Sequence, residues 1–290
     1  MRKKLLLAGA ALFGAVAMHG QAYVSVSGGY GFEINKKVVG RDATNTPPID
    51  LKGSYGEGFQ AQLRGGYFFH RRWGTELSLG YLHGEDIQTN RNAILDMNAR
   101  GRAFGASLSL VFNITDNLYV RAGGVTKIGG RTESITKLNA TLPLQLFSQT
   151  PVPSTATVNM KADFQTNFHG KVPFGFIGGV GYRFKVADHI ALFIEGEYLN
   201  INVPRKKSKL DSFSATRTVG GVTTPLTIEE FRGYMDIVKN LPSNANTERL
   251  VLLANQISPL LEEEYDWDGK GAPDAPYSSF GVHFGVTYSF

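Results

Sequence analysis

Two arginines and two glutamates are the residues of this sequence best placed for shared chemistry. They are Arg64, Glu76, Arg121 and Glu195, and each lies in a segment where apolar and polar residues alternate. Arg64 lies five residues before the end of its segment at residue 69, and Glu195 lies five residues after the start of its segment at residue 190. Glu76 and Arg121 lie three residues after the starts of their segments at residues 73 and 118. The planar guanidinium group suits two-point pairing with a carboxylate. Because an unpaired charge away from bulk water is costly, we expect the four side chains to form one ion-pair network.

Two roles are open for such a network. In the first, the paired charges fill and rigidify the interior of the protein. In the second, the arginines exchange partners and so gate a narrow path for ions or water.

Other polar residues suggest catalysis or metal binding, but their spacing supports neither. His283 lies within reach of Glu195 or Glu197 and could act as an acid or base, yet no serine with an oxyanion hole accompanies it. The run 83–86 (His-Gly-Glu-Asp) matches no specific metal motif, and the acidic run 262–268 lacks the glycine and ligand spacing of an EF-hand loop. We therefore expect no enzyme activity, no catalytic residue, no bound cofactor and no metal site.

The elements that would position the four charged residues are β-strands. Successive side chains of a strand point to opposite faces, so a strand that separates two environments alternates with period two. Eight segments of about ten residues show this alternation, and ten residues is the length a tilted strand needs to cross a bilayer. The segments are 24–34, 59–69, 73–82, 103–112, 118–126, 174–184, 190–201 and 280–290.

The last segment shows the pattern most clearly. Its apolar side carries Phe280, Val282, Phe284, Val286, Tyr288 and Phe290, and its other side carries glycine, His283, threonine and serine. Eight such strands predict an all-β fold, an eight-stranded antiparallel transmembrane β-barrel. The interior of a barrel this small is just wide enough for side chains to fill it.

The connections between the segments alternate between short and long. Residues 70–72, 113–117 and 185–189 form short turns, whereas the stretches 35–58, 83–102, 127–173 and 202–279 are long. Outer-membrane barrels have short periplasmic turns and long extracellular loops. We therefore expect the four long connections to lie outside the cell.

The fourth long connection, 202–279, also contains a helical pattern. Thr227 and Glu230 fit a capping box, and apolar residues then recur at helical spacing, which predicts helices at about 228–241 and 247–261. We interpret them as a short helical hairpin that rests on the barrel rim. A separate soluble domain is the alternative, but a segment of this size is short of core on its own.

The N-terminus has the features of an export signal. Arg2, Lys3 and Lys4 precede an apolar run, and small residues follow, which predicts a signal peptide over 1–22 and a barrel over 23–290. A second cleavage site at Ala15-Val16-Ala17 and an amphipathic helix that is not cleaved are the alternatives. Without residues 1–22 the chain has 27 basic and 25 acidic residues, so a nucleic-acid-binding protein is a poor interpretation. The absence of cysteine excludes disulfides and thiolate metal sites.

These features together resemble the outer-membrane protein β-barrel superfamily typified by the OmpA transmembrane domain and OmpX. The phrases that carry the resemblance are Leu118-Tyr-Val-Arg-Ala-Gly-Gly124, Gly178-Gly-Val-Gly-Tyr-Arg-Phe184 and the end Tyr288-Ser-Phe290. The resemblance implies a location in the cell outer membrane, among outer-membrane lipid and lipopolysaccharide. It also implies that Tyr288 and Phe290 are the assembly signal read by the barrel assembly machinery. The four charged residues resemble the ion-pair network inside barrels of this family.

Three functions are compatible with this resemblance. The first is a structural or surface-interaction role, in which the interior is plugged and the long loops contact lipopolysaccharide, a surface ligand or a host protein. The second is a narrow gated channel or a conduit for small or hydrophobic solutes. The third, which the lack of a catalytic set disfavours, is a lipid-A-modifying enzyme or a protease at the rim.

Overall fold

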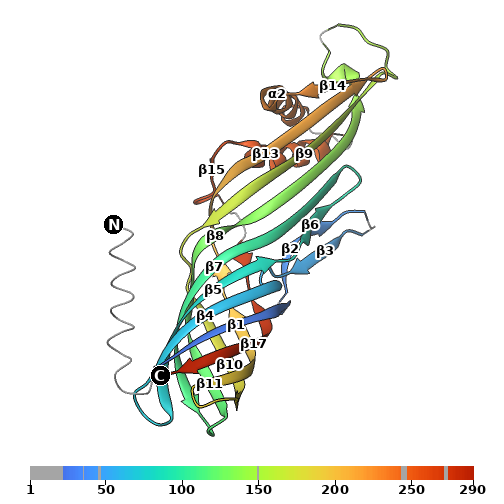
Figure 1. The fold of residues 1–290 in the computed structure, drawn as a ribbon. Helices are drawn as coiled ribbons and strands as arrows, with labels where there is room; N and C mark the ends of the chain where they lie inside the picture. Colours follow the sequence, from blue (N-terminus) through green and yellow to red (C-terminus); the bar gives the residue numbers. More distant parts are fainter. Residues whose placement is uncertain (1–21, 35, 45–46, 149, 243–246, 271–273) are drawn as a thin grey trace.

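Eight strands form a closed barrel, as predicted (Figure 1). The computed structural model describes residues 22–290 except 35, 45–46, 149, 243–246 and 271–273, so the predicted signal peptide, Ala22 apart, lies outside the described residues. The barrel strands are β1 (Ala22–Glu33), β4 (Gly58–Phe68), β5 (Trp73–Gly84), β7 (Leu95–Asn113), β8 (Leu118–Pro143), β10 (Gly175–Lys185), β11 (Ile190–Asn200) and β17 (Ser279–Ser289). Neighbours in this order are antiparallel, and β17 pairs with β1 to close the sheet.

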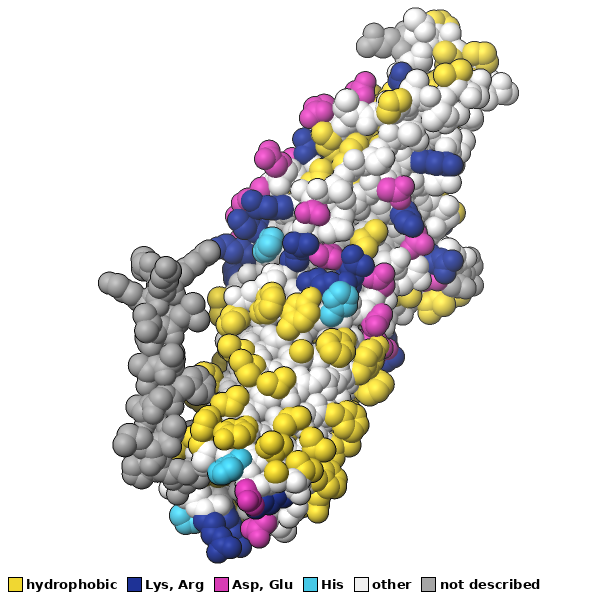
Figure 2. Space-filling model, in the orientation of Figure 1, with side chains coloured by type: hydrophobic (Ala, Val, Ile, Leu, Met, Phe, Trp, Pro, Cys, Tyr) yellow, Lys and Arg dark blue, Asp and Glu magenta, His cyan; other side chains and the backbone are white. Residues whose placement is uncertain are grey.

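The outer surface of the barrel is apolar. Exposed side chains on it include Val26, Leu63, Leu77, Leu108, Phe176, Val180, Leu192 and Phe284, each on the parity that the alternation predicts. Figure 2 shows hydrophobic side chains as a band over the lower part of the molecule. Such a band matches the hydrocarbon layer of a bilayer, because lipid can cover apolar side chains that water would not.

All the short turns lie at one end of the barrel. Residues 69–72, 114–117 and 186–189 connect neighbouring strands there. The ends of the described chain meet at the same end, where the Phe290 amide donates to the Ala22 carbonyl oxygen at 3.0 Å. The long connections therefore all leave from the opposite end.

Two barrel strands continue far beyond the predicted length. Strand β7 begins at Leu95 rather than 103, and β8 ends at Pro143 rather than 126. Above the barrel β8 pairs with β9 (Thr157–Gly170), which pairs with β13 (Arg205–Val219), which in turn pairs with β14 (Val222–Leu226). On the other side β7 pairs with β6 (Ile87–Arg91), and β2 (Lys37–Asp42) and β3 (Ile49–Gly53) extend the sheet beyond β6. We call residues 87–102, 130–170 and 205–268 the extension. Sequence analysis assigned these residues to loops, so the extension corrects that prediction.

Two helices cover one face of the extension. They are α2 (Ile228–Lys239) and α3 (Glu248–Ile257), and a 3-10 turn at Ser258–Leu261 follows α3. The capping box is present, since the Glu230 amide donates to Thr227 Oγ1 at 3.2 Å and the Thr227 amide donates to the Glu230 carboxylate at 2.8 Å. The two helices contact each other. Among the described residues, no helix combines the length and the apolar character that crossing a membrane requires.

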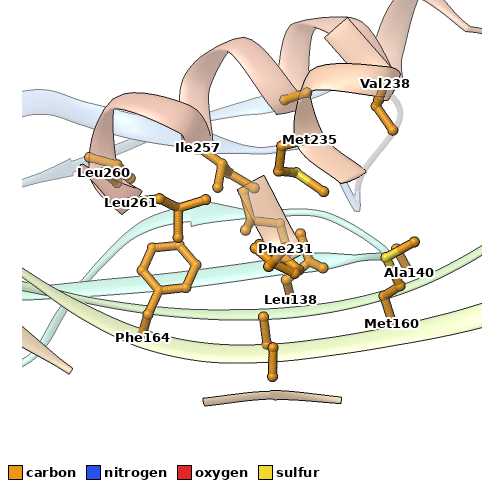
Figure 3. Packing of buried hydrophobic residues seen from close by; sticks show 14 of the residues in the cluster. Leu138, Ala140, Met160, Phe164, Phe231, Met235, Val238, Ile257, Leu260 and Leu261 are labelled. Carbon is orange, nitrogen blue, oxygen red and sulfur yellow. The ribbon is translucent and has the colours of Figure 1, made fainter. Parts of the chain in front are cut away.

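The prediction that the helices rest on the barrel rim is wrong. They pack on the sheet of β8, β9 and β13, where Phe231, Met235 and Ile257 meet Leu138 and Phe164 (Figure 3). These side chains are buried, and the rings of Phe213 and Phe231 lie 5.5 Å apart. The helical segment lacks a core on its own, but the apolar faces of β8 and β9 supply the missing half. Burial of that shared core stabilises the extension.

A small cap lies over the mouth of the barrel. Strands β12 (Asn202–Val203) and β16 (Ala275–Pro276) pair there, and the rings of Tyr55 and Tyr277 lie 5.7 Å apart. Both tyrosines are buried with Leu82, Ile201 and Val203, and Tyr277 Oη lies 2.7 Å from Thr132 Oγ1. The cap therefore joins the fourth long connection to the upper end of the barrel wall.

Candidate functional site

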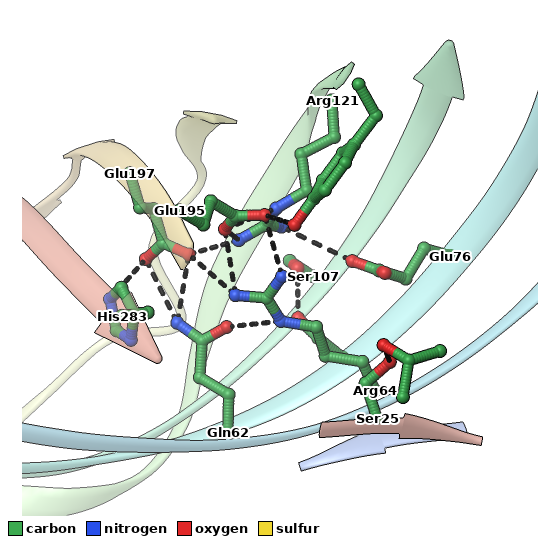
Figure 4. Close-up of polar contacts among 12 residues, drawn as sticks. Ser25, Gln62, Arg64, Glu76, Ser107, Arg121, Glu195, Glu197 and His283 are labelled. Carbon is green, nitrogen blue, oxygen red and sulfur yellow. Dashed lines mark hydrogen bonds and ion pairs between the residues drawn. The ribbon is translucent and has the colours of Figure 1, made fainter. Parts of the chain in front are cut away.

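The structure brings Arg64, Glu76, Arg121 and Glu195 together inside the barrel (Figure 4). Strands β4, β5, β8 and β11 carry them, and each side chain lies on the inward parity of its strand. All four are buried. The inward face of each strand at these positions is the polar face of the alternation.

Arg64 and Glu195 form the central pair of this network. Nη1 and Nη2 of Arg64 donate to Oε2 and Oε1 of Glu195, each at 2.9 Å. This two-point geometry uses the planar fork of the guanidinium and is the strongest arrangement for an arginine with a carboxylate. Their side chains are 2% and 0% exposed, so bulk solvent does not screen the pair.

Arg121 joins three carboxylates. Its Nε donates to Glu195 Oε1 at 3.0 Å, and its Nη2 donates to the Glu197 carboxylate. Its Nη1 lies 3.6 Å from Glu76 Oε1, which is an ion-pair distance rather than a hydrogen bond. Glu76 is thus held to the network by charge alone at this point.

Two further inward-facing residues, Glu197 and Gln62, belong to the network in addition to the four predicted ones. The Gln62 amide donates to both oxygens of Glu197 at 3.0 and 2.9 Å, and Arg64 Nε donates to Gln62 Oε1 at 2.9 Å. Glu197 follows Glu195 by two residues, so the two carboxylates must share one face. That spacing is the signal from which Glu197 could have been included.

Two tyrosines complete the hydrogen bonding and were also missed. Tyr119 Oη donates to Glu195 Oε2 at 2.7 Å, and Tyr23 Oη donates to Glu76 Oε2 at 2.8 Å. Tyr119 lies two residues before Arg121 on β8, so the two side chains share the inward face. Which tyrosine reaches which glutamate depends on side-chain length across the barrel, and alternation does not encode it.

Glycine at position 179 makes room for this network. A Cβ atom there would lie 3.2 Å from Glu195 Cδ and 3.3 Å from Arg121 Nε. Those distances are shorter than ordinary van der Waals contact, so the two charged groups could not keep their positions beside a larger residue.

The network carries more negative than positive groups. Three carboxylates, those of Glu76, Glu195 and Glu197, face the guanidinium groups of Arg64 and Arg121. Loss of either arginine would leave buried carboxylates without compensation. Such losses typically cost about 3–5 kcal/mol of stability.

His283 lies beside the network on β17. It faces Glu195 in the strand register, is fully buried, and its Nε2 lies 3.8 Å from Glu197 Oε1. Neither ring nitrogen has a hydrogen-bond partner among the residues that the structure describes. Its position thus places a histidine and a carboxylate side by side, without the hydrogen bond that orients an acid–base pair.

The acidic run 262–268 pairs with basic residues instead of facing solvent alone. Glu264 lies 3.2 Å from Lys207 Nζ and 2.7 Å from Lys209 Nζ, and Asp268 lies 2.7 Å from Lys171 Nζ. Across the described residues, no group of three or more histidine, aspartate or glutamate side chains is arranged to hold a metal ion.

Tyr288 and Phe290 lie at the end of the barrel that carries the short turns. Both side chains are exposed on the apolar band, and their rings are 5.2 Å apart. The Tyr288 ring also stacks on His189 at 5.8 Å. An aromatic pair at this height suits the membrane interface.

A family model decides the classification of the chain. The model of the outer membrane protein beta-barrel domain matches residues 5–220, which is most of the sequence. The chain belongs to this family. The predicted resemblance to outer-membrane β-barrels is thereby confirmed, and the outer-membrane barrel described here follows the family in fold and in its membrane-facing band. No curated protein sequence matches the chain.

Several solved structures match the chain at low similarity. CarO2 of Acinetobacter baumannii is 12% identical, with 92% of this chain and 99% of that chain covered and a TM-score of 0.31. Ail, the attachment invasion locus protein of Yersinia pestis, is 12% identical, with 94% and 100% covered and a TM-score of 0.29. A FadL homologue of Pseudomonas aeruginosa is 9% identical, with 95% and 91% covered and a TM-score of 0.26. These values are too low to assign any function to this outer-membrane barrel.

Proposed function

We propose that this outer-membrane barrel is a surface-interaction protein without enzyme activity. In this proposal the barrel is a filled anchor in the outer membrane, and the extension presents a rigid surface to a ligand or a host protein outside the cell. The barrel contacts outer-membrane lipid and lipopolysaccharide around its circumference.

The observation that carries the proposal is the continuity of β7 and β8. Strand β8 has 26 residues, and at about 3.3 Å per residue it extends over roughly 85 Å. Only its first ten residues or so are needed to cross the membrane. The extension is therefore built on strands whose lower ends are fixed in the barrel wall, and its own buried core keeps it ordered.

The contents of the barrel support the role of anchor. Two layers of side chains lie across its interior, the ion-pair network around Arg64 and, nearer the mouth, the cap with Tyr55 and Tyr277. A cavity of about 90 Å³ lies between these layers and includes Gln62 and Tyr277 in its lining. A cavity of this size has room for several water molecules.

A narrow gated channel is the second candidate, and one observation favours it. Arg121 Nη1 and Glu76 Oε1 are 3.6 Å apart, and neither atom has a hydrogen bond among the described residues. A pair held so loosely could exchange partners and open a path.

Assembly of the barrel is proposed to use Tyr288 and Phe290 as the signal for the barrel assembly machinery. Both side chains are exposed at the end of the closing strand, where another protein can reach them. Replacement of Phe290 by alanine should lower the yield of folded barrel in cells but not the yield on refolding in detergent. An equal loss in both settings would contradict a role as a signal.

Attachment of lipid vesicles tests the surface-interaction role. Vesicles that contain the chain would be passed over surfaces coated with collagen, fibronectin or laminin and over an uncoated surface. The comparison chain keeps the barrel but replaces residues 130–170 and 205–268 with short turns. Retention of the full chain on a coated surface and loss of retention with the comparison chain support the proposal. Equal behaviour of the two chains on every surface contradicts it.

A further inference from the structure

We propose that the outward face of β7 and β8, where the barrel meets the extension, binds the phosphate groups of a phosphorylated glycolipid in the outer leaflet. The inference rests on one part of the proposed function, the contact of the barrel with outer-membrane lipid, and assigns that contact to named residues; it does not concern the partner of the extension. It stands even if the extension contacts no protein.

The level of the site in the membrane follows from one face of β7. Phe104 is 51% exposed on the apolar band, and Arg102 lies two residues further on the same face. Two residues of a strand span about 7 Å, so Arg102 lies just above the last lipid-facing aromatic residue of β7. That is the height at which lipid headgroups begin.

The same step from aromatic to basic residues occurs on neighbouring strands. Tyr81 pairs with Phe104 in the lower row, and His83 pairs with Arg102 in the upper row. Arg102 in turn pairs with Arg131 of β8. A basic row on three adjacent strands thus lies directly above an aromatic row on two of them, since the residue of β8 that pairs with Phe104 is Gly129. Figure 2 shows Lys and Arg side chains gathered along the upper margin of the hydrophobic band.

The pairing of Arg102 with Arg131 points to an anion. Like charges directly opposite each other on neighbouring strands destabilise a sheet. Among the described residues, Arg102 meets no carboxylate, and its Nη1 donates to the carbonyl oxygens of Gly84 at 2.6 Å and Gly101 at 3.1 Å. A phosphate between the two guanidinium groups would remove the repulsion and accept hydrogen bonds from both planar forks.

The one carboxylate at the site is already neutralised. Arg131 Nη2 lies 2.8 Å from Glu133 Oε1, and Arg100 Nε lies 2.8 Å from Glu133 Oε2. Burial by itself would raise the pKa of Glu133, but the hydrogen bonds from the two arginines outweigh burial and lower that pKa. Glu133 is therefore ionised, and two arginines share its single charge.

A cleft beside these residues is large enough for a headgroup. It measures about 860 Å³, and the charged groups of its lining are Arg102, Lys127, Arg131, Lys171 and Glu133. Three positive charges, those of Arg102, Arg131 and Lys171, thus face one carboxylate in the lining, because Lys127 Nζ lies over the buried Tyr277 ring, 5.2 Å from its centroid. Lys171 also pairs with Asp268 at 2.7 Å. The excess positive charge suits a ligand with more than one phosphate.

The barrel wall changes strand partners at this cleft. On the far side of β8, the pairing with β10 ends at Val125, and the pairing with β9 begins at Thr132. Exposed apolar side chains lie beside the gap, with Ile128 at 58%, Val172 at 82% and Phe174 at 86% exposure. Acyl chains can cover these side chains while the phosphates occupy the cleft, so a lipid fits the site better than soluble phosphate.

Native mass spectrometry of the full chain tests the inference. The folded protein, in detergent with neutral lipid, would be titrated with a bisphosphorylated lipid A and with the same lipid after removal of its phosphates. The test variant is the double substitution R102Q/R131Q. The matched control is K137Q/K161Q, which removes the same charge from two exposed residues of the extension.

We expect R102Q/R131Q to raise the Kd for the bisphosphorylated lipid about tenfold or more, which corresponds to about 1.4 kcal/mol. K137Q/K161Q should change this Kd less than about twofold. The parent protein should bind the dephosphorylated lipid as weakly as R102Q/R131Q binds the bisphosphorylated lipid. R102K keeps the charge but loses the planar fork, so it should give an intermediate Kd. R102K replaces R102Q/R131Q as the test variant if R102Q/R131Q fails to fold.

Equal binding by the parent and R102Q/R131Q would overturn the inference, as would equal binding of the two lipids by the parent. Competition by millimolar inorganic phosphate distinguishes the two sources of phosphate. Displacement of the lipid at that concentration would identify a site for free phosphate and would overturn the assignment to a lipid. An outcome in which the lipid binds at this site but vesicles attach to no surface would contradict the proposed function alone.

Discussion

Arg64 of β4 holds Glu195 of β11 through two parallel hydrogen bonds of 2.9 Å, across the two strands, β1 and β17, that lie between them. The pair therefore lies across the space through which any solute would have to pass. Arg121, Gln62 and the Tyr119 hydroxyl group bond directly to this pair, and Glu197 is held by Gln62 and Arg121, so the pair widens into a layer.

Stability should depend on which charge is removed from the network. Arg64→Met leaves one guanidinium facing three buried carboxylates, so we expect a loss of about 3–5 kcal/mol in the free energy of unfolding. Glu195→Gln leaves two of each and should cost less. Urea unfolding of the chain in lipid vesicles measures both, with the exposed turn residue Arg71→Met as a control expected within about 0.5 kcal/mol of the parent. A loss below about 1 kcal/mol for Arg64→Met would contradict the network as a stabilising layer.

Two glycine substitutions should have opposite signs. Gly179→Ala puts a Cβ atom 3.2 Å from Glu195 Cδ, and overpacking of this kind costs about 1–3 kcal/mol. Gly233→Ala lies in the exposed interior of α2, where no heavy atom lies within 4 Å of the new Cβ, and should stabilise by about 0.5–1 kcal/mol. The same urea experiment compares them. Two effects of the same sign would be inconsistent with the packing described here.

The extension should unfold separately from the barrel when its core is damaged. Phe231 is fully buried against β13, and Phe231→Ala should cost the extension about 3–5 kcal/mol. The two tryptophans report on the two parts, since Trp73 lies on β5 and Trp267 donates to Ser208 Oγ at 2.8 Å in the extension. Single-tryptophan chains, with Trp73→Phe or Trp267→Phe, would show a shift in Trp267 emission alone. A simultaneous shift of Trp73 would mean that the two parts unfold as one.

Acid should loosen the extension before it affects the barrel. The carboxyl pKa of Glu264 is lowered chiefly by its hydrogen bonds to Lys209 and Lys207, and the pKa of Glu133 is also lowered, because its arginine partners outweigh burial. A group whose folded pKa lies below its unfolded pKa stabilises the fold above the unfolded value, about 4.3 for glutamate, and loses this effect as the pH falls through the folded pKa. Trp267 emission should therefore begin to change below about pH 4. Constant emission down to about pH 2 would refute this account of the ion pairs.

The barrel could be predicted from the sequence because each strand that crosses the membrane has apolar side chains toward lipid and small or polar side chains toward the interior. Leu108 and Leu110 face outward and Ser107 and Ser109 face inward, so period-two alternation gave the strands, their faces and the depth of Arg64 and Glu195. The network could be predicted because charged side chains that point into the barrel at similar depth lie close enough to form ion pairs. Its full membership depends on side-chain reach, which is why Tyr23 and Tyr119 were not assigned to it.

The extension was not predicted because its alternation was taken for loop sequence. Leu138, Ala140 and Leu142 alternate with exposed Lys137, Asn139 and Thr141, and β9 shows the same pattern. Ile128 is an extra residue in the β8 ladder, and Gly130 adopts φ +88. Even-numbered apolar residues such as Val120 therefore face lipid in the barrel, whereas even-numbered residues such as Leu138 face the buried core in the extension. The cover for that apolar face comes from α2 and α3, which lie about 90 residues further along the chain than β8.

Conductance across a planar bilayer tests most directly whether the barrel is a filled anchor. The refolded parent chain should insert without any stepwise current, and Arg121→Ala should be equally silent because the pair of Arg64 with Glu195 and the cap at Tyr277 remain. Insertion is verified on the same sample by the slower migration of the heated chain on a gel. Discrete openings of the parent chain would contradict the filled barrel and favour the gated channel.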